Sequence, residues 1–354
     1  YALDGYLKAA MGKGVDSALV KREMTIAYIS DNYKNGLTDE YAEKGYSEDV
    51  YNTYKKEHKS DLLAVDVKYF ECSSADDAKK FKKALKADGS NFASKYSSSD
   101  WDKTANKDAV ETTYYDMTRS TLKGLSAAIA SADSEKDKNG NKTYSNLDWL
   151  YSSDRKAGDV NTNQDITSVV YIIKPAHYPT TNTVNIRHIL VTPYYTEKGS
   201  DDSSSSKKDA TEATADQWKA AYKQAQTILK EYQKGKKTAD SFGELAKKYS
   251  EDNNASKGGV YENVTPNQMV STFDAWCFDS ARKAGDVEIV KTKFGYHVMY
   301  FEKKNDMPTW KYNAQQAMAG EDSKSASDKI DSKYTSKTNS FGKYFFEIDT
   351  DIDS

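Results

Sequence analysis

The hexapeptide Arg155-Lys156-Ala157-Gly158-Asp159-Val160 occurs twice in this chain, letter for letter, the second time at residues 282–287. An exact repeat of six residues is improbable by chance, and self-similarity of this kind indicates a duplicated structural unit. The same order of features precedes each copy: a strand-like run, a helix-like stretch, and the pattern Ala-x-Lys-Tyr-Ser, which begins at Ala93 and again at Ala246. The chain therefore contains two related units.

Each unit begins and ends with a strand-like run, and apolar residues recur at helical spacing between these runs. The opening runs are residues 65–70 and 184–189, the closing runs are residues 169–173 and 296–301, and the helical spacing is seen at Ala78, Phe81 and Leu85 in the first unit and from Trp218 to Tyr232 in the second. The pattern predicts an α+β fold with two small antiparallel sheets flanked by helices.

The regions outside the repeat are predicted to be helical, with thin apolar patterns that could not hold a core alone. A stretch with two prolines, residues 174–179, reads as the linker between the units, because proline interrupts regular elements. The predicted domains are a helical N-terminal segment at 1–62, a first repeat at 63–178, a second repeat at 183–306, and a helical C-terminal segment at 307–354.

Composition excludes several classes of function. The 354 residues include 51 basic and 54 acidic side chains, which are interspersed and give a net charge of -3, so no basic surface for nucleic acid is expected. No stretch approaches the roughly 18–20 apolar residues of a membrane span, so any membrane anchor would lie outside this chain. Two cysteines and four scattered histidines provide no metal-ligand spacing, and neither a metal nor a cofactor is expected.

The second repeat resembles a parvulin-type peptidyl-prolyl cis-trans isomerase, or rotamase, domain over essentially its whole length. The resemblance rests on residues 185–191 (Asn-Ile-Arg-His-Ile-Leu-Val), on 249–252 (Tyr-Ser-Glu-Asp), on the pair Gly258-Gly259, and on 294–298 (Phe-Gly-Tyr-His-Val). It implies a catalyst that breaks no bond. Rotation about a prolyl amide faces a barrier of about 18–20 kcal/mol from resonance, so the site must stabilise a twisted amide.

The same resemblance implies the residues of the site. His188 and His297 are expected on adjacent strands, hydrogen-bonded to each other, and Asp252 near the substrate carbonyl. Met269 and Phe273, four residues apart on a predicted helix, are expected to form one wall against the proline ring. The catalytic residues implied are His188, Asp252 and His297, and the substrate-binding residues are Met269, Phe273, Thr292 and Tyr261. Tyr261 departs from the family pattern, which has an apolar residue there.

The first repeat keeps the scaffold pattern but has Tyr69 in place of His188, and no histidine is expected in its closing strand. It is therefore interpreted as a degenerate, catalytically silent copy. The remaining histidines, His58 and His177, are interpreted as solvated. Residues 135–140 imitate part of a calcium-binding loop but lack its closing glutamate, and they are interpreted as a turn.

Helical segments around rotamase domains resemble the architecture of PrsA- and SurA-type foldases. This resemblance implies an extracytoplasmic, surface or membrane-anchored protein that acts on unfolded, proline-containing clients, and it leaves a homodimer open. An alternative function is a non-enzymatic chaperone that cradles unfolded secreted chains, and a third is a passive surface spacer. A peptide isomerisation assay separates the first function from the other two.

Overall fold

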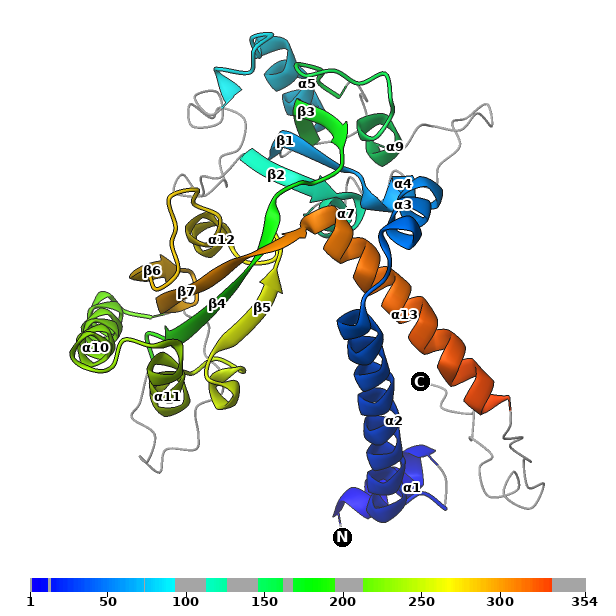
Figure 1. Ribbon diagram of the computed structural model, residues 1–354, viewed down its shortest axis with the longest axis vertical. Helices are drawn as coiled ribbons and strands as arrows, with labels where there is room; N and C mark the ends of the chain where they lie inside the picture. The colour runs from blue at the N-terminus through cyan, green and yellow to red at the C-terminus, as the bar shows by residue number, and fades with distance from the viewer. Residues whose placement is uncertain are drawn as a thin grey trace. The chain divides into compact units, whose positions relative to one another are not determined.

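The computed structural model describes residues 2–11, 14–72, 74–92, 113–125, 146–161, 168–194 and 213–332 (Figure 1). Two compact units divide the chain: Tyr1–Tyr54 together with Asn313–Ser354, and Lys55–Tyr312. No helix in the described ranges is both long and apolar enough to cross a bilayer. The first Ala-x-Lys-Tyr-Ser motif and the turn expected at residues 135–140 lie outside the described residues.

The described residues of the unit that contains the two chain ends are mainly helical, as predicted for 1–62 and for the first part of 307–354; residues 333–354 lie outside the described part of the chain. Helix α2 begins where the Asp16 carboxylate accepts a hydrogen bond from the backbone N–H of Leu19, and it ends at Gly45, whose φ of 66° closes the last turn. The chain ends are joined by a hydrogen bond from the Tyr51 hydroxyl to the Gln315 side chain, at 2.7 Å. The helices are α1 (Ala2–Met11), α2 (Ser17–Lys44), α3 (Glu48–Glu57) and α13 (Thr309–Asp331), of which α3 and α13 run on into the second unit.

The first repeat forms a sheet with strand order β2-β1-β3, antiparallel throughout. Alternate residues of β1 point to opposite faces, so Val67 packs against α7 and α9 while Phe70 packs against α5. The strands are β1 (Ala64–Glu71), β2 (Thr113–Thr118) and β3 (Ser168–His177), and the helices are α4 (Lys59–Leu62), α5 (Ala75–Ala84), α7 (Arg119–Leu125) and α9 (Asn146–Leu150).

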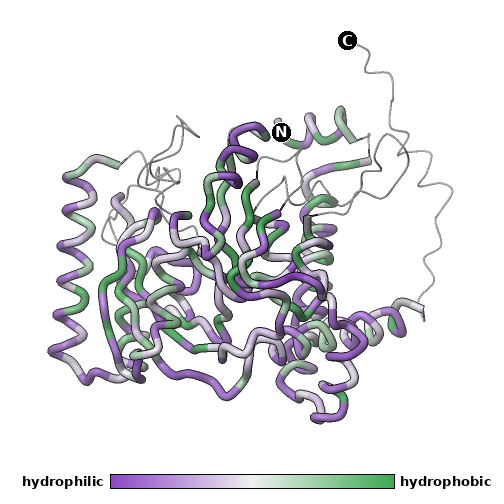
Figure 2. The backbone as a smooth tube through the Cα atoms, turned by 90° about the horizontal axis from the view of Figure 1, so that it is seen from above, coloured by the Kyte–Doolittle hydropathy of each residue, from purple (hydrophilic) through white to green (hydrophobic). Residues whose placement is uncertain are grey.

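The second repeat forms a sheet with strand order β5-β4-β7-β6, also antiparallel. Ile189 of β4 faces α10 and α11, whereas Ile186 faces α12 on the other side. Helix α10, at the left of both views, alternates hydrophilic and hydrophobic residues as an amphipathic helix does (Figure 2). The elements are β4 (Asn182–Val191), α10 (Ala215–Lys234), α11 (Ala239–Tyr249), β5 (Val260–Val264), α12 (Ser271–Cys277), β6 (Val287–Thr292) and β7 (Gly295–Pro308).

The repeated hexapeptide forms the same turn in both copies. Gly158 and Gly285 have φ of 95° and 89°, and each donates its backbone N–H to the closing strand, to Ile172 and Phe301 respectively, at 2.8 Å in both cases. The two arginines that open the hexapeptides stack on tryptophans six residues upstream, with distances to the ring centroid of 5.0 Å in the first copy and 4.2 Å in the second. The two repeats therefore share the local structure of this turn as well as its sequence.

The closing strand of the first repeat is longer than predicted. Residues 174–177 belong to β3 and not to a linker, and Pro175 lies inside the strand. Two predictions were therefore wrong: β3 does contain a histidine, His177, and this side chain is only 14% exposed because it lies between the carboxylates of Asp66 and Asp116. Those partners are far away in sequence, so the local pattern gave no sign of them.

Candidate active site

The two histidines expected in the site lie on the two central strands of the second sheet. In the antiparallel register of β4 and β7, His188 is opposite Met299 and His297 is opposite Leu190, so the two imidazoles are diagonal neighbours on the same face as α12. Their Nδ1 atoms are 3.0 Å apart, and both side chains are buried. The sheet register alone therefore brings together two residues that are 109 positions apart.

Each histidine of the pair makes a further polar contact on its outer side. On one side, the Thr292 hydroxyl lies 2.8 Å from His297 Nε2 and accepts a hydrogen bond from the backbone N–H of Phe294 at 3.1 Å. On the other side, His188 Nε2 faces Asp252 Oδ1 at 3.5 Å. With one proton on each imidazole, these contacts run in one direction, from the Thr292 hydroxyl through both rings to the Asp252 carboxylate, which can only accept.

The protonation states follow from burial and from the neighbouring charges. Burial, and to a lesser degree the nearby His188, lowers the pKa of His297 to about 3, so this ring is neutral at ordinary pH. Burial alone would raise the pKa of Asp252. The hydrogen bond from His188, assisted by the backbone N–H of Asn254 and by the Tyr261 hydroxyl, outweighs burial, so the pKa of Asp252 falls well below its usual range.

Local backbone structure fixes the position of Asp252. The segment after α11 is attached to the end of β4 by two bonds: the backbone N–H of Leu190 donates to Ser250 Oγ at 3.1 Å, and the backbone N–H of Glu251 donates to the Leu190 carbonyl at 3.0 Å. The backbone N–H of Asn254 then donates to Asp252 Oδ1 at 2.9 Å, which closes a turn around the carboxylate. Sequence reasoning did not assign Ser250 or Asn254 to the site, although Ser250 belongs to the motif that carried the family resemblance.

Tyr261 packs against the same apolar cluster as Phe273 and also takes part in the polar network. Its hydroxyl donates to Asp252 Oδ1 at 3.0 Å, and its ring centroid lies 5.2 Å from that of His188. Burial, followed by the charge of Asp252, raises the pKa of Tyr261 to about 12, so the phenol keeps its proton and remains a donor. The departure from the family pattern therefore places an additional hydrogen-bond donor next to the predicted catalytic carboxylate.

The apolar wall is formed by α12. Phe273 is buried and lies edge-on to both imidazoles, with centroid distances of 5.2 Å to each ring. Met269 packs against the same apolar cluster, but α12 begins only at Ser271, so Met269 lies in the turn before the helix. The expectation that Met269 and Phe273 share one helical face was therefore wrong, although both lie against the same cluster.

The first copy has no equivalent of the histidine pair. Tyr69 occupies in β1 the place of His188 in β4. The shared turn pairs Gly158 with Ile172 as it pairs Gly285 with Phe301, so Ser168 occupies in β3 the place of His297 in β7. Within the described residues, the group of acidic and imidazole side chains close enough to share one cation lies elsewhere in this copy, at Asp66, Asp116 and His177.

Comparisons with known proteins agree with this geometry. The family model Rotamase, described as a PPIC-type PPIASE domain, matches residues 188–303. A foldase protein PrsA of Staphylococcus epidermidis is 37% identical over 99 residues, which cover 27% of this chain and 29% of that protein. A foldase protein PrsA 1 of Listeria innocua is 33% identical over 86 residues, which cover 24% of this chain and 29% of that protein.

Among solved structures, PrsA from Bacillus subtilis is 24% identical, with 47% of this chain and 55% of that chain covered and a TM-score of 0.29. The match to the curated relatives thus spans less than a third of their length. The chain has an α+β fold, and its residues 188–303 belong to the PPIC-type rotamase family, the parvulin family of peptidyl-prolyl isomerase domains.

Proposed function

We propose that the second repeat, residues 183–306, catalyses cis-trans isomerisation of X-Pro bonds in polypeptide clients. One observation carries the proposal: a buried, one-directional hydrogen-bond chain ends on a charged carboxylate directly beside an apolar ring wall. Uncatalysed exchange about a prolyl bond takes tens to hundreds of seconds. A thousandfold acceleration requires only about 4 kcal/mol of additional stabilisation of the twisted amide.

The proposed roles divide between an apolar part and a polar part. Phe273 and Met269 would hold the proline ring away from water, and the charged Asp252 with His188 would act on the amide carbonyl and nitrogen as the bond twists. Thr292 and His297 would fix the orientation and tautomer of His188. Tyr261 would hold the Asp252 carboxylate in place through its hydroxyl, and it would also border the substrate.

The test is a proline-containing tetrapeptide assay on the full chain. His188→Ala and Asp252→Ala should each reduce the isomerisation rate by at least about tenfold, since the first interrupts the polar network and the second removes the carboxylate at its end. His58→Ala serves as the matched control, because His58 lies in the turn before α4, outside the second repeat, and should leave the rate unchanged. Unchanged rates in the His188 and Asp252 variants would show that the site assignment is wrong.

A second function, holding unfolded clients, is supported by the helical unit. Helices α1 and α2 carry eight large apolar side chains that are 52–69% exposed, and such side chains are available to contact the apolar segments of an unfolded client. These residues are Leu3, Tyr6, Met11, Met24, Ile26, Tyr28, Ile29 and Tyr33. Replacing Met24 and Tyr28 by Ser should weaken the suppression of client aggregation and leave peptide isomerisation intact.

The remaining parts of the proposal follow from the likeness to foldases. The first repeat, residues 63–178, would be a degenerate copy without catalytic activity, and the flanking segments 1–62 and 307–354 would form the chaperone-like module. The clients would be exported polypeptides, so the protein would act outside the cytoplasm; attachment to a membrane and assembly into a homodimer would both be compatible with this role. Fractionation of cells and sedimentation of the purified protein test the location and the assembly respectively.

A further inference from the structure

The second sheet contains a small knot of three amide side chains. Asn305 Nδ2 donates to Asn185 Oδ1 at 2.8 Å and to Asn263 Oδ1 at 3.0 Å, and the backbone N–H of Asn263 donates to Asn185 Oδ1 at 2.9 Å. The knot sits at a bulge between β4 and β5, where Asn263 has a φ of 51°. All three side chains are neutral, so this knot holds the edge strand to the sheet at any ordinary pH.

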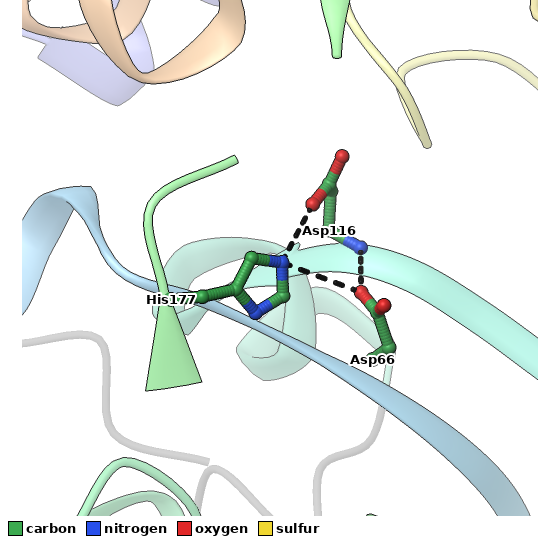
Figure 3. A group of neighbouring side chains, drawn as sticks. All are labelled: Asp66, Asp116 and His177. Carbon is green, nitrogen blue, oxygen red and sulfur yellow. Dashed lines mark hydrogen bonds and ion pairs between the residues drawn. The ribbon is translucent and has the colours of Figure 1, made fainter. Parts of the chain in front are cut away.

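The first sheet contains the ionisable counterpart of this knot (Figure 3). The bulge recurs between β1 and β2, Asp116 again has a φ of 51°, and its backbone N–H donates to Asp66 Oδ1 at 2.8 Å. Carboxylates thus replace two of the amides. The donor is His177, whose Nε2 lies 3.0 Å from Asp116 Oδ1 and 3.7 Å from Asp66 Oδ1.

Counting protons determines the state of His177. Its Nδ1 lies 2.9 Å from the Pro175 carbonyl, which can only accept, so Nδ1 carries a proton. Its Nε2 faces two carboxylates, which at neutral pH can also only accept. In the second sheet the corresponding position is held by a donor, the Asn305 amide. Both ring nitrogens of His177 must therefore be protonated for the knot to be complete.

The surrounding charges agree with a cationic ring. Lys174 of β3 is near both His177 and Asp116, and the Lys55 ammonium lies 4.1 Å from the ring centroid of Tyr178, the next residue. Asp274 of α12 lines the same cavity, about 640 Å³, as Asp66 and Asp116. The negative charge of the carboxylates, which favours a protonated His177 ring, therefore outweighs the opposing positive charge of the lysines.

The pKa of His177 and the pKa of Asp116 are shifted in opposite directions. Burial alone would lower the pKa of His177, but the hydrogen bonds to Asp116 and to the Pro175 carbonyl, with the charge of Asp66, outweigh burial and raise it. Burial alone would likewise raise the pKa of Asp116, and the hydrogen bonds from His177 and Thr181 reverse this and lower it. Each group thus favours the charged state of the other.

We propose that His177 is a charged pin that holds edge strand β2 to the first sheet, so that this copy responds to pH where the amide knot of the second copy does not. The pin also reaches the connection to the second copy, because the Thr181 hydroxyl donates to Asp116 Oδ2 at 2.8 Å just before β4. Deprotonation of His177 leaves one ring proton where two are needed, so either the carboxylates or the Pro175 carbonyl loses its donor, and the positive charge between the carboxylates is lost; both effects loosen β2 and its tie to Thr181.

The sign and the pH window follow from linkage. A raised pKa of His177 in the folded state gives a contribution that is complete below the ordinary value of ~6.5 and is lost as the pH rises through the folded-state value. The lowered pKa of Asp116 gives a contribution that is present above ~3.9 and is lost as the pH falls. The pin is therefore fully engaged between about pH 4 and about pH 6.5, and it weakens above that range.

The direct test is an NMR titration of the four histidine rings in the full chain. The His177 ring should titrate above the ordinary value of ~6.5. In addition, the thermal unfolding midpoint should fall as the pH rises through that titration. The variant Asp66→Asn/Asp116→Asn/His177→Gln rebuilds the three-amide knot, and it should remove the part of the pH dependence that follows the His177 titration. If that variant fails to fold, the single substitution His177→Gln makes the same comparison.

Three results would overturn the proposal. One is a His177 ring that titrates at or below ~6.5. Another is an amide variant whose unfolding midpoint depends on pH as steeply as that of the wild type. The third is stoichiometric binding of Zn²⁺, measured by calorimetry near neutral pH, that the amide variant loses, since the occupant between His177 and the carboxylates would then be a metal ion and not a proton.

Discussion

Replacement of Gly259 by Ala should disrupt the second sheet at the point where it supports His188, the proposed catalytic histidine. Gly259 has a φ of 70°, and a Cβ added there would lie 2.2 Å from the carbonyl oxygen of His188 and 3.1 Å from the side chain of Ala246. Carbon and oxygen atoms in contact normally keep about 3.3 Å. Because the obstructing atom is backbone, the sheet must move by about 1 Å to admit the methyl group.

The magnitude combines two effects. A left-handed backbone costs a non-glycine residue about 1–2 kcal/mol. The displacement also weakens the hydrogen bond from the His188 N–H to the Gly259 carbonyl, now 3.0 Å, which contributes about 1 kcal/mol, and it leaves buried groups poorly paired. We expect Gly259→Ala to destabilise the folded state by about 3–5 kcal/mol.

The matched control is Gly285→Ala, in the repeated turn of the same copy. Gly285 has a φ of 89°, and nothing lies within 4 Å of an added Cβ, so only the backbone effect of about 1–2 kcal/mol remains. Urea unfolding followed by tryptophan fluorescence should place the Gly259 variant roughly 1 M below the Gly285 variant. Peptide isomerisation should fall only in the former. Equal midpoints for the two variants would refute the steric argument.

Three further predictions concern buried groups. Thr292→Val should lower the free energy of unfolding in urea by about 1–3 kcal/mol and lower the isomerisation rate, because it leaves His297 Nε2 without its hydroxyl partner. Unchanged stability and rate would contradict the hydrogen bond from the Thr292 hydroxyl to His297. Lowering the pH from 6 to 3 should lower the thermal unfolding midpoint, because Asp252 and His297 bind protons more readily in the unfolded chain than in the folded protein. The double variant Asp252→Asn/His297→Gln should show a weaker dependence of the midpoint on pH. An unchanged dependence would contradict the lowered pKa values of both residues. Cys72 and Cys277 are buried, and burial raises the pKa of the Cys277 thiol. Iodoacetamide should therefore modify both thiols only after unfolding. Rapid alkylation of the native protein would contradict their buried positions.

The histidine pair was expected from the resemblance to rotamase domains, and the sequence pattern itself contributed only the placement of both residues on strands. Alternation along a strand decides which face a residue occupies, and the apolar neighbours of His188 and His297 marked both strands clearly. Side-chain contacts that depend on pairing between strands could not be predicted from the sequence. His177 was taken to be solvated because its neighbours in sequence are prolines and polar residues, whereas its partners Asp66 and Asp116 are more than 60 positions away.

Element boundaries account for the other errors. Pro175 suggested a linker, but a strand tolerates proline where no ladder hydrogen bond requires its nitrogen, and β3 runs through it. Met269 and Phe273 have helical spacing, yet α12 begins between them at Ser271, and spacing alone does not mark a helix start. The hydrogen bond from Tyr261 to Asp252 was also missed, because it depends on a turn that brings β5 back beside the end of α11.

A nascent chain presents two identical turns to two similar closing strands. Gly158 could bond to β7, and Gly285 to β3, with the same backbone geometry, so the hexapeptide itself cannot distinguish the correct partner from the exchanged one. Discrimination must come from the residues around the turn, such as Asn161, whose side chain accepts the backbone N–H of Val170 at 2.8 Å in a buried position. During synthesis, early closure of the first sheet before the second emerges would protect the chain from strand exchange.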